Sequence, residues 1–100
     1  VEWLTDVYTK ENYPRLNRKK RKAREADRLS KAPAAAQTVK YADIIDNAID
    51  IAGHDKDFAK VFLRECGQLL RQMDKGNQQL YERAVKTVAD CLSELQRAGA

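Results

Sequence analysis

A repeating pattern of carboxylate and amide side chains lies in the middle of the chain, within the segment TVKYADIIDNAID at residues 38–50. Steps of three and four residues separate its members, so they share one stripe of a helix. Such a stripe can hold a cation, or it can be the solvated acidic flank of an ordinary amphipathic helix. The residue types alone leave both interpretations open. The members are Asp43, Asp46, Asn47 and Asp50.

An apolar stripe adjoins these carboxylates and predicts which face of the helix is buried. Its spacing also follows the helical period, so we expect it to pack into the core. The carboxylates would then lie at the edge of a buried surface, where each needs a cation, a hydrogen-bond donor or water. The apolar residues are Val39, Ala42, Ile45, Ile49 and Ala52.

The positive charge of the chain is concentrated in one block. The chain has 100 residues, a formal net charge of +4 and a hydrophobic fraction of 43%, enough for the core of one small domain. Between Arg15 and Lys31 there are nine Lys or Arg residues and two acids. A block of this kind predicts an anionic partner: nucleic acid, an acidic surface or the phosphates of a small ligand.

Helix signals predict an all-α fold, a compact domain of about four helices preceded by a helix remnant at residues 1–7. Asn12 or Tyr13 is expected to cap the first full helix, with Pro14 in its first turn. Pro33 begins the central helix and Gly53 ends it. The four helices are predicted at residues 14–29, 34–52, 57–73 and 78–97.

The last two helices carry apolar stripes that we expect to be buried. Asp55 or Asp57 is predicted to cap the first of them, and Asn77 the second. One stripe comprises Phe58, Val61, Phe62, Cys66, Leu69, Leu70 and Met73; the other comprises Leu80, Ala84, Val88, Cys91, Leu92 and Leu95.

The sequence lacks the common catalytic and metal-binding motifs, and it also indicates the cellular compartment. There is no Gly-rich phosphate loop, no Cys/His zinc spacing and no Ser/His/Asp set. His54 directly follows a predicted helix end, where we expect a structural role instead of metal binding. Cys66 and Cys91 read as reduced core thiols of a cytoplasmic protein, which agrees with the lack of a signal peptide or a membrane-spanning stretch.

Several segments together resemble the HD-superfamily hydrolases of the RelA/SpoT type, including the small single-domain SpoT homologues of animals. VKYADIIDN at residues 39–47 resembles the family's K-x-A-D-x-x-x-N motif. VEWLTDVYTKENYPRLNRKK, KAPAAAQTVKYAD and GNQQLYERAV resemble further family segments. The resemblance covers most of the chain, although residues 48–73 match only in pattern.

The resemblance implies an all-α domain with a divalent metal, usually Mn²⁺. The implied activity removes the 3′-pyrophosphate of guanosine tetra- or pentaphosphate, the nucleotides of the stringent response. Asp43 matches a metal-ligating Asp, and Asn47 matches a catalytic Asn that acts as an orienting group. The positions that match substrate-binding residues are Arg15, Arg18, Lys19 and Lys40.

The chain also departs from the family. The first metal-binding His and the His-Asp pair lie upstream of the matched segments, and His54 and Asp55 follow Asp43 in the wrong order to replace them. We therefore expect residues 1–100 to be the C-terminal portion of a single HD-type domain, incomplete without its upstream helices and inactive alone. Its partners would be the guanosine nucleotide and either the missing part of the domain or a second chain.

A second interpretation needs no upstream part. The chain could be a non-catalytic all-α binding module whose basic helix contacts nucleic acid or another anionic partner. Nucleic acid binding would show a steep salt dependence, because many phosphates are contacted, and nucleotide binding a shallow one. A degenerate or split domain that pairs with another chain is a third interpretation.

Overall fold

The predicted order of helices is present in the computed structural model, which describes residues 7–98. The described residues contain no strand, so the all-α prediction is confirmed. Residues 1–6, which hold most of the predicted helix remnant, lie outside the described part. No described helix has the length and apolar composition needed to cross a membrane. The helices are α1 (Arg18–Ser30), α2 (Ala34–Ala52), α3 (Lys56–Gln72) and α4 (Gln78–Ala98).

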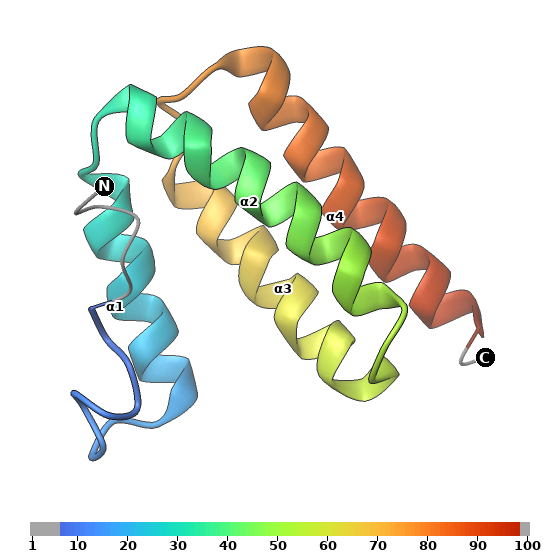
Figure 1. Cartoon of the computed structure of the whole chain (residues 1–100), viewed down its shortest axis with the longest axis horizontal. Helices are drawn as coiled ribbons and strands as arrows, with labels where there is room; N and C mark the ends of the chain where they lie inside the picture. The colour runs from blue at the N-terminus through green and yellow to red at the C-terminus, as the bar shows by residue number, and fades with distance from the viewer. Residues whose placement is uncertain (1–6, 99–100) are drawn as a thin grey trace.

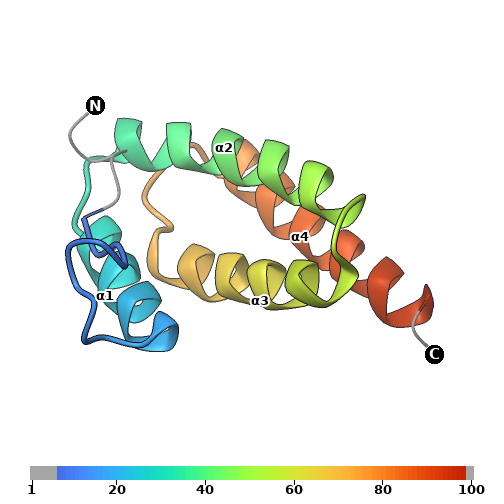
Figure 2. The ribbon, with the colours of Figure 1, turned by 60° about the horizontal axis from the view of Figure 1, so that its bottom comes forward.

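Three of the helices form a bundle and the fourth packs on its side. α2, α3 and α4 are consecutive and contact one another, with α3 running opposite to its two neighbours (Figure 1). α1 packs chiefly against α3 and lies at an angle to the bundle (Figures 1 and 2). A ligand site that uses the basic residues of α1 must therefore lie on the α1 side of the bundle.

Side-chain caps set the start of three helices. Asp55 caps α3 and Asn77 caps α4, which confirms both predictions. The predicted start of α1 is wrong, because Asn17 caps this helix by accepting a hydrogen bond from the N–H of Lys20 at 2.9 Å. Pro14 instead lies in the turns that precede α1.

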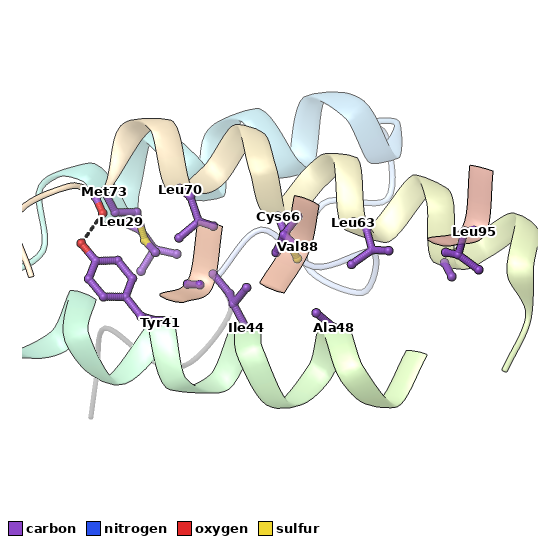
Figure 3. Close-up of a cluster of buried hydrophobic side chains, with 12 residues drawn as sticks. Leu29, Tyr41, Ile44, Ala48, Leu63, Cys66, Leu70, Met73, Val88 and Leu95 are labelled. Carbon is purple, nitrogen blue, oxygen red and sulfur yellow. Dashed lines mark hydrogen bonds between the residues drawn. The ribbon is translucent and has the colours of Figure 1, made fainter. Parts of the chain in front are cut away.

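The hydrophobic core lies between α2, α3 and α4, with one contribution from α1. In Figure 3 the buried side chains of α2 point toward those of α3. Cys66 and Cys91 are free thiols, as predicted. The core residues are Leu29, Tyr41, Ile44, Ala48, Ala59, Leu63, Cys66, Leu70, Met73, Ala84, Val88 and Leu95.

The predicted buried stripe of α2 is wrong for three of its five residues. Val39, Ala42 and Ile49 are exposed, with 51% of Val39 and 61% of Ile49 accessible to solvent. α2 is apolar around much of its circumference, so periodicity alone could not select the buried face. The face that is buried contains Gln37, Tyr41, Ile44 and Ala48.

The predicted stripe of α3 is confirmed for Cys66, Leu70 and Met73, which are buried, and is wrong only near the start of the helix. Phe58 and Val61 are partly exposed, and Ala59 and Leu63 occupy the core instead. α3 packs against α1 as well as against the bundle, so its apolar residues divide between two interfaces. On α4 the predicted residues Ala84, Val88 and Leu95 are buried, and Leu80, Cys91 and Leu92 are partly buried.

Gln37 is a buried polar residue that joins two interhelical loops to α2. Its amide Nε2 donates to the carbonyls of Leu29 at 2.9 Å and Ala32 at 3.2 Å, at the turn between α1 and α2. Its Oε1 accepts from the N–H of Lys75 at 2.9 Å, in the loop between α3 and α4. Gln37 can be fully buried because both ends of its amide are bonded.

Thr38 and Tyr41 hold the loop between α3 and α4 at further points. The Tyr41 hydroxyl donates to the carbonyl of Met73 and accepts from the N–H of Gly76 at 3.0 Å (Figure 3). Thr38 Oγ1 accepts from the N–H of Asn77 at 2.7 Å. The loop therefore lies so close to α2 that a Cβ on Gly76 would be 2.6 Å from Tyr41 Cε2 and 2.9 Å from the Thr38 nitrogen.

We expect Gly76→Ala to destabilise the domain by about 1–3 kcal/mol, because the added methyl group overpacks the contact with α2. Urea unfolding measures the change. Gly67→Ala is the matched control, since a Cβ at Gly67 meets no atom within 4 Å. Gly67 lies inside α3, so this control should gain up to about 1 kcal/mol from helix propensity. Equal stability of the two variants would contradict the close approach at Gly76.

Candidate ligand-binding cleft

A cleft of about 200 Å³ opens between α1, α2 and α3. It has an apolar floor and a charged rim, a combination found in many small-molecule sites. Its lining includes three of the residues that the family resemblance singled out, Lys40, Asp43 and Asn47. The full lining is Lys22, Glu25, Leu29, Lys40, Asp43, Ile44, Asn47, Phe62, Glu65, Cys66 and Leu69.

α2 contributes the motif residues to the cleft. Lys40, Asp43 and Asn47 are separated by three and four residues, so one face of the helix presents all three. Lys40 Nζ bonds to Asp43 Oδ2 at 3.2 Å. The Lys40 side chain is 19% exposed, whereas the Asp43 side chain is 50% exposed. Asp43 therefore faces solvent at the mouth of the cleft and remains accessible to a ligand.

An ion pair joins α1 to α3 beside the cleft: Glu65 lines the cleft, whereas its partner Arg18, a predicted substrate-binding residue, does not. Arg18 donates two hydrogen bonds to Glu65, from Nε at 2.8 Å and from Nη2 at 3.0 Å. The guanidinium also lies 5.1 Å from the ring centroid of Phe58, within cation–π distance. The bonds to Glu65 raise the pKa of Arg18 above its ordinary value. Arg18 thus has a structural task, docking α1 onto α3.

Glu25 is a buried carboxylate that holds the segment before α1. Its Oε1 accepts from the N–H groups of Val7 at 2.7 Å and Tyr8 at 2.6 Å, and Arg28 donates to its Oε2 at 2.8 Å. Burial disfavours the charged form, but the bonds from Arg28, Tyr8 and Val7 outweigh it. The pKa of Glu25 is consequently lower than its ordinary value.

Cys66 lies on the floor of the cleft and does not provide a nucleophile at neutral pH. Burial raises the pKa of its thiol to about 12, and the nearby Lys40 and Lys22 only partly oppose this rise. The reactive form of cysteine is the thiolate, which is scarce at such a pKa. The chemistry of the cleft therefore depends on its charged and amide side chains.

Lys22 leaves the cleft with a net charge of +1 when the ion-pair partners of its carboxylates are counted with the lining. Each lining carboxylate has its own cation: Glu25 has Arg28, Asp43 has Lys40, and Glu65 has Arg18. No ion pair within residues 7–98 includes Lys22. The lining itself holds two lysines and three carboxylates, so the attraction for an anion is local to Lys22, which has no carboxylate partner among the described residues.

The remaining candidate residues lie outside the cleft. Arg15 lines a separate hollow formed by residues 12–16 and Arg24. Lys19 is exposed on α1, and Asp46 and Asp50 are exposed on α2. None of these four side chains lines the cleft that contains Asp43.

Sequence reasoning did not assign Lys22 and Glu65 to the site. Lys22 is one of nine basic residues in its block, and nothing in the spacing distinguishes it from its neighbours. Glu65 belongs to no motif, and its partner Arg18 is 47 residues away along the chain. A signal for this pair could have come from covariation between the two positions, which a single sequence does not contain.

The described residues do not by themselves fit a catalytic metal. Within residues 7–98 no group of three or more His, Cys, Asp or Glu side chains is arranged to hold a metal ion. His54 Nε2 lies 3.6 Å from Asp50 Oδ1, near the C-terminal end of α2. This end of the helix is far from Lys40, and His54 does not line the cleft. Asp43 could supply one carboxylate, whereas a transition-metal site needs several ligands.

Comparison with known proteins found no family model, no curated protein and no solved structure that matches this chain. The site is therefore interpreted from its own geometry and from the motif resemblance.

The pKa shift of Glu25 predicts how stability changes with pH. Its folded-state pKa is below the ordinary value of 4.5, so its contribution is complete above pH 4.5 and is lost as the pH falls through the folded-state pKa. We expect the loss of unfolding free energy in Glu25→Gln, relative to the native chain, to be larger at pH 7 than at pH 3. Urea unfolding across this range measures it.

Glu11→Gln is the control for that comparison. Glu11 is exposed and forms none of the ion pairs found among the described residues, so its replacement should leave the pH profile unchanged. A constant stability difference between Glu25→Gln and the native chain at every pH would contradict the assignment.

Proposed function

We propose that this chain is the C-terminal portion of an HD-type phosphohydrolase that removes pyrophosphate from guanosine tetra- or pentaphosphate. The observation that carries the proposal is the position of Lys40, Asp43 and Asn47 at one cleft. These are the residues that match the K-x-A-D-x-x-x-N motif. The cleft also contains Lys22, a cation without an ion-pair partner among the described residues, which supports binding of a phosphorylated ligand.

In this proposal the residues of the cleft have separate tasks. Lys22 and Lys40 would bind and neutralise substrate phosphates, and Asn47 would orient a bound group through its amide. Asp43 would contribute one ligand to a Mn²⁺ site completed by the family's upstream His and His-Asp residues. Since the described residues do not form that site, the chain alone should bind Mn²⁺ weakly and should not hydrolyse the nucleotide.

The first prediction concerns nucleotide binding by the chain alone. Lys22→Ala combined with Lys40→Ala should weaken binding of guanosine tetraphosphate by about tenfold or more, because two phosphate-facing charges are lost. Isothermal titration calorimetry at low salt measures the affinity. Arg83→Ala combined with Lys75→Ala removes the same charge from exposed positions outside the cleft and should have little effect. Equal affinity of all three proteins would count against the cleft.

The second prediction concerns Asp43 in a completed site. The chain is mixed with a segment that supplies the upstream His and His-Asp residues, and pyrophosphate release from guanosine tetraphosphate is followed with Mn²⁺. Asp43→Ala should lower turnover by roughly a hundredfold or more, since even groups that merely orient metal ligands contribute roughly 10–100-fold. The fold should be intact, because the Asp43 side chain is half exposed.

Asp46→Ala is the matched control for that experiment. Asp46 is an exposed carboxylate three residues away on the same helix, and it does not line the cleft. This variant should retain turnover. Full turnover by Asp43→Ala, or equal losses in both variants, would refute the assignment of Asp43.

Nucleic acid binding is a second candidate function, favoured by the surface of the basic block. Six of its residues belong to no ion pair within the described chain. One of them, Arg21, donates to the carbonyl of Leu16, and the other five have charges available to a polyanion. The salt dependence of binding separates the two functions. Five phosphate contacts on a single strand predict a slope of log affinity against log salt of roughly −3.5. The residues are Arg15, Lys19, Lys20, Lys22 and Arg24.

A further inference from the structure

A second and larger hollow lies between α3 and α4, separate from the candidate cleft. This groove has a volume of about 410 Å³, and no residue of α1 or α2 lines it. Its lining runs along α4 from Tyr81 to Leu92, a stretch of twelve residues whose ends lie about 16.5 Å apart along the helix axis. The groove is lined by Leu63, Arg64, Gly67, Gln68, Leu70, Arg71, Tyr81, Val85, Val88, Ala89 and Leu92.

The floor of the groove is suited to apolar side chains. Leu63 and Leu70 form its base, and Val85 on its α4 side is 41% exposed. The polar atom of Tyr81 is already satisfied, because its hydroxyl donates to the carbonyl of Leu70 at 3.0 Å. Gly67 leaves the middle of the floor open, since a Cβ placed there would meet no atom within 4 Å. An occupant that fills the floor gains hydrophobic contact without removing a hydrogen bond.

The α3 edge of the groove carries positive charge. Arg64 and Arg71 are seven residues apart, two turns of helix or about 10.5 Å along the axis. Both are exposed, and neither belongs to an ion pair within the described chain. Among residues 7–98 no carboxylate lines the groove, and its α4 edge is apolar. The charge on the groove is therefore one-sided and without internal compensation.

We propose that the groove binds an amphipathic helix from a partner protein, with an apolar stripe on the floor and carboxylates along one flank. A helix of about three turns matches the length of the lining, and docking of a helix into a groove is a common recognition mode. Carboxylates seven residues apart on the partner would lie about 10.5 Å apart, the same separation as Arg64 and Arg71 along α3. Charge complementarity would then fix the orientation of the helix.

The outer face of α2 in a second copy is a poorer occupant. It has exposed apolar residues, but its carboxylates seven residues apart are Asp43 and Asp50, and Asp43 is bonded to Lys40. Docking of α2 into the groove of another copy would also join unlike surfaces. A closed dimer would need both contacts at once, with the α2 face of each copy in the groove of the other.

The test uses the full chain and a synthetic helical peptide of 16 residues. The peptide carries a Leu stripe, Glu residues seven positions apart on one flank and Ala elsewhere, and a second peptide has Lys in place of each Glu. Fluorescence anisotropy measures both affinities. The Glu peptide should bind the native chain at least about tenfold more tightly than the Lys peptide. Arg64→Glu combined with Arg71→Glu should reverse this preference.

Two further variants separate the groove from non-specific charge effects. Gly67→Leu should fill the floor and weaken binding of the Glu peptide about tenfold or more, while circular dichroism shows an intact fold. Arg83→Glu combined with Lys75→Glu makes the same charge change outside the groove and should leave the preference of the native chain unchanged.

Three results would overturn the proposal. The first is equal binding of the two peptides, or a preference that the Arg64 and Arg71 substitutions do not move. The second is a concentration-dependent self-association, seen by sedimentation velocity, that Gly67→Leu abolishes, because the groove would then hold a second copy. The third is binding of dodecanoate with the same dependence on Arg64 and Arg71 in the absence of peptide binding, because the groove would then be a lipid site.

Discussion

The hydrogen bonds from three side chains of α2 to two loops determine how the four helices are arranged. Gln37 bonds to the turn between α1 and α2 and also to the loop between α3 and α4. Thr38 and Tyr41 bond to the second of these loops. A buried backbone group without a partner costs roughly 1–3 kcal/mol, so these contacts favour one position of each loop over others. Gly76 is required there because a side chain would not fit.

This set of contacts also determines which residues face the candidate cleft. With Gln37 and Tyr41 held toward the loops, the rotation of α2 about its axis is fixed. Lys40, Asp43 and Asn47 then face the space beside α1 and α3, and Val39 and Ile49 are left outside. The pair of Arg18 and Glu65 docks α1 on α3 beside this space. The polar contacts at one end of α2 thus position charged residues one to three turns away.

The sequence predicted the parts of the fold that depend on local signals. Gly53, Asp55 and Asn77 act at helix ends through bonds to residues a few positions away, and their roles were predicted correctly. The buried face of α2 was not, because apolar residues surround much of this helix and the buried face includes Gln37, whose polar atoms are satisfied only by tertiary contacts with two loops.

The residues of the candidate site also fall into two groups, those that local spacing predicts and those that only tertiary packing brings together. The spacing of Lys40, Asp43 and Asn47 places them on one helix face before any tertiary structure is known. Lys22 and Glu65 join them only because α1 and α3 pack beside α2. The partner of Glu65 is far away in the sequence, so no local rule could assign it.

The balance of charge in the cleft constrains what Asp43 can do. A cation that approached Asp43 in the described domain would meet Lys40, which is already bonded to that carboxylate, and the uncompensated charge of Lys22. The same two lysines, which repel a cation, would attract an anion. Asp43 can therefore serve as a metal ligand only where further ligands from elsewhere offset this positive charge. Phosphate binding needs no such addition, so it is the part of the proposed function that can be tested on the described residues alone.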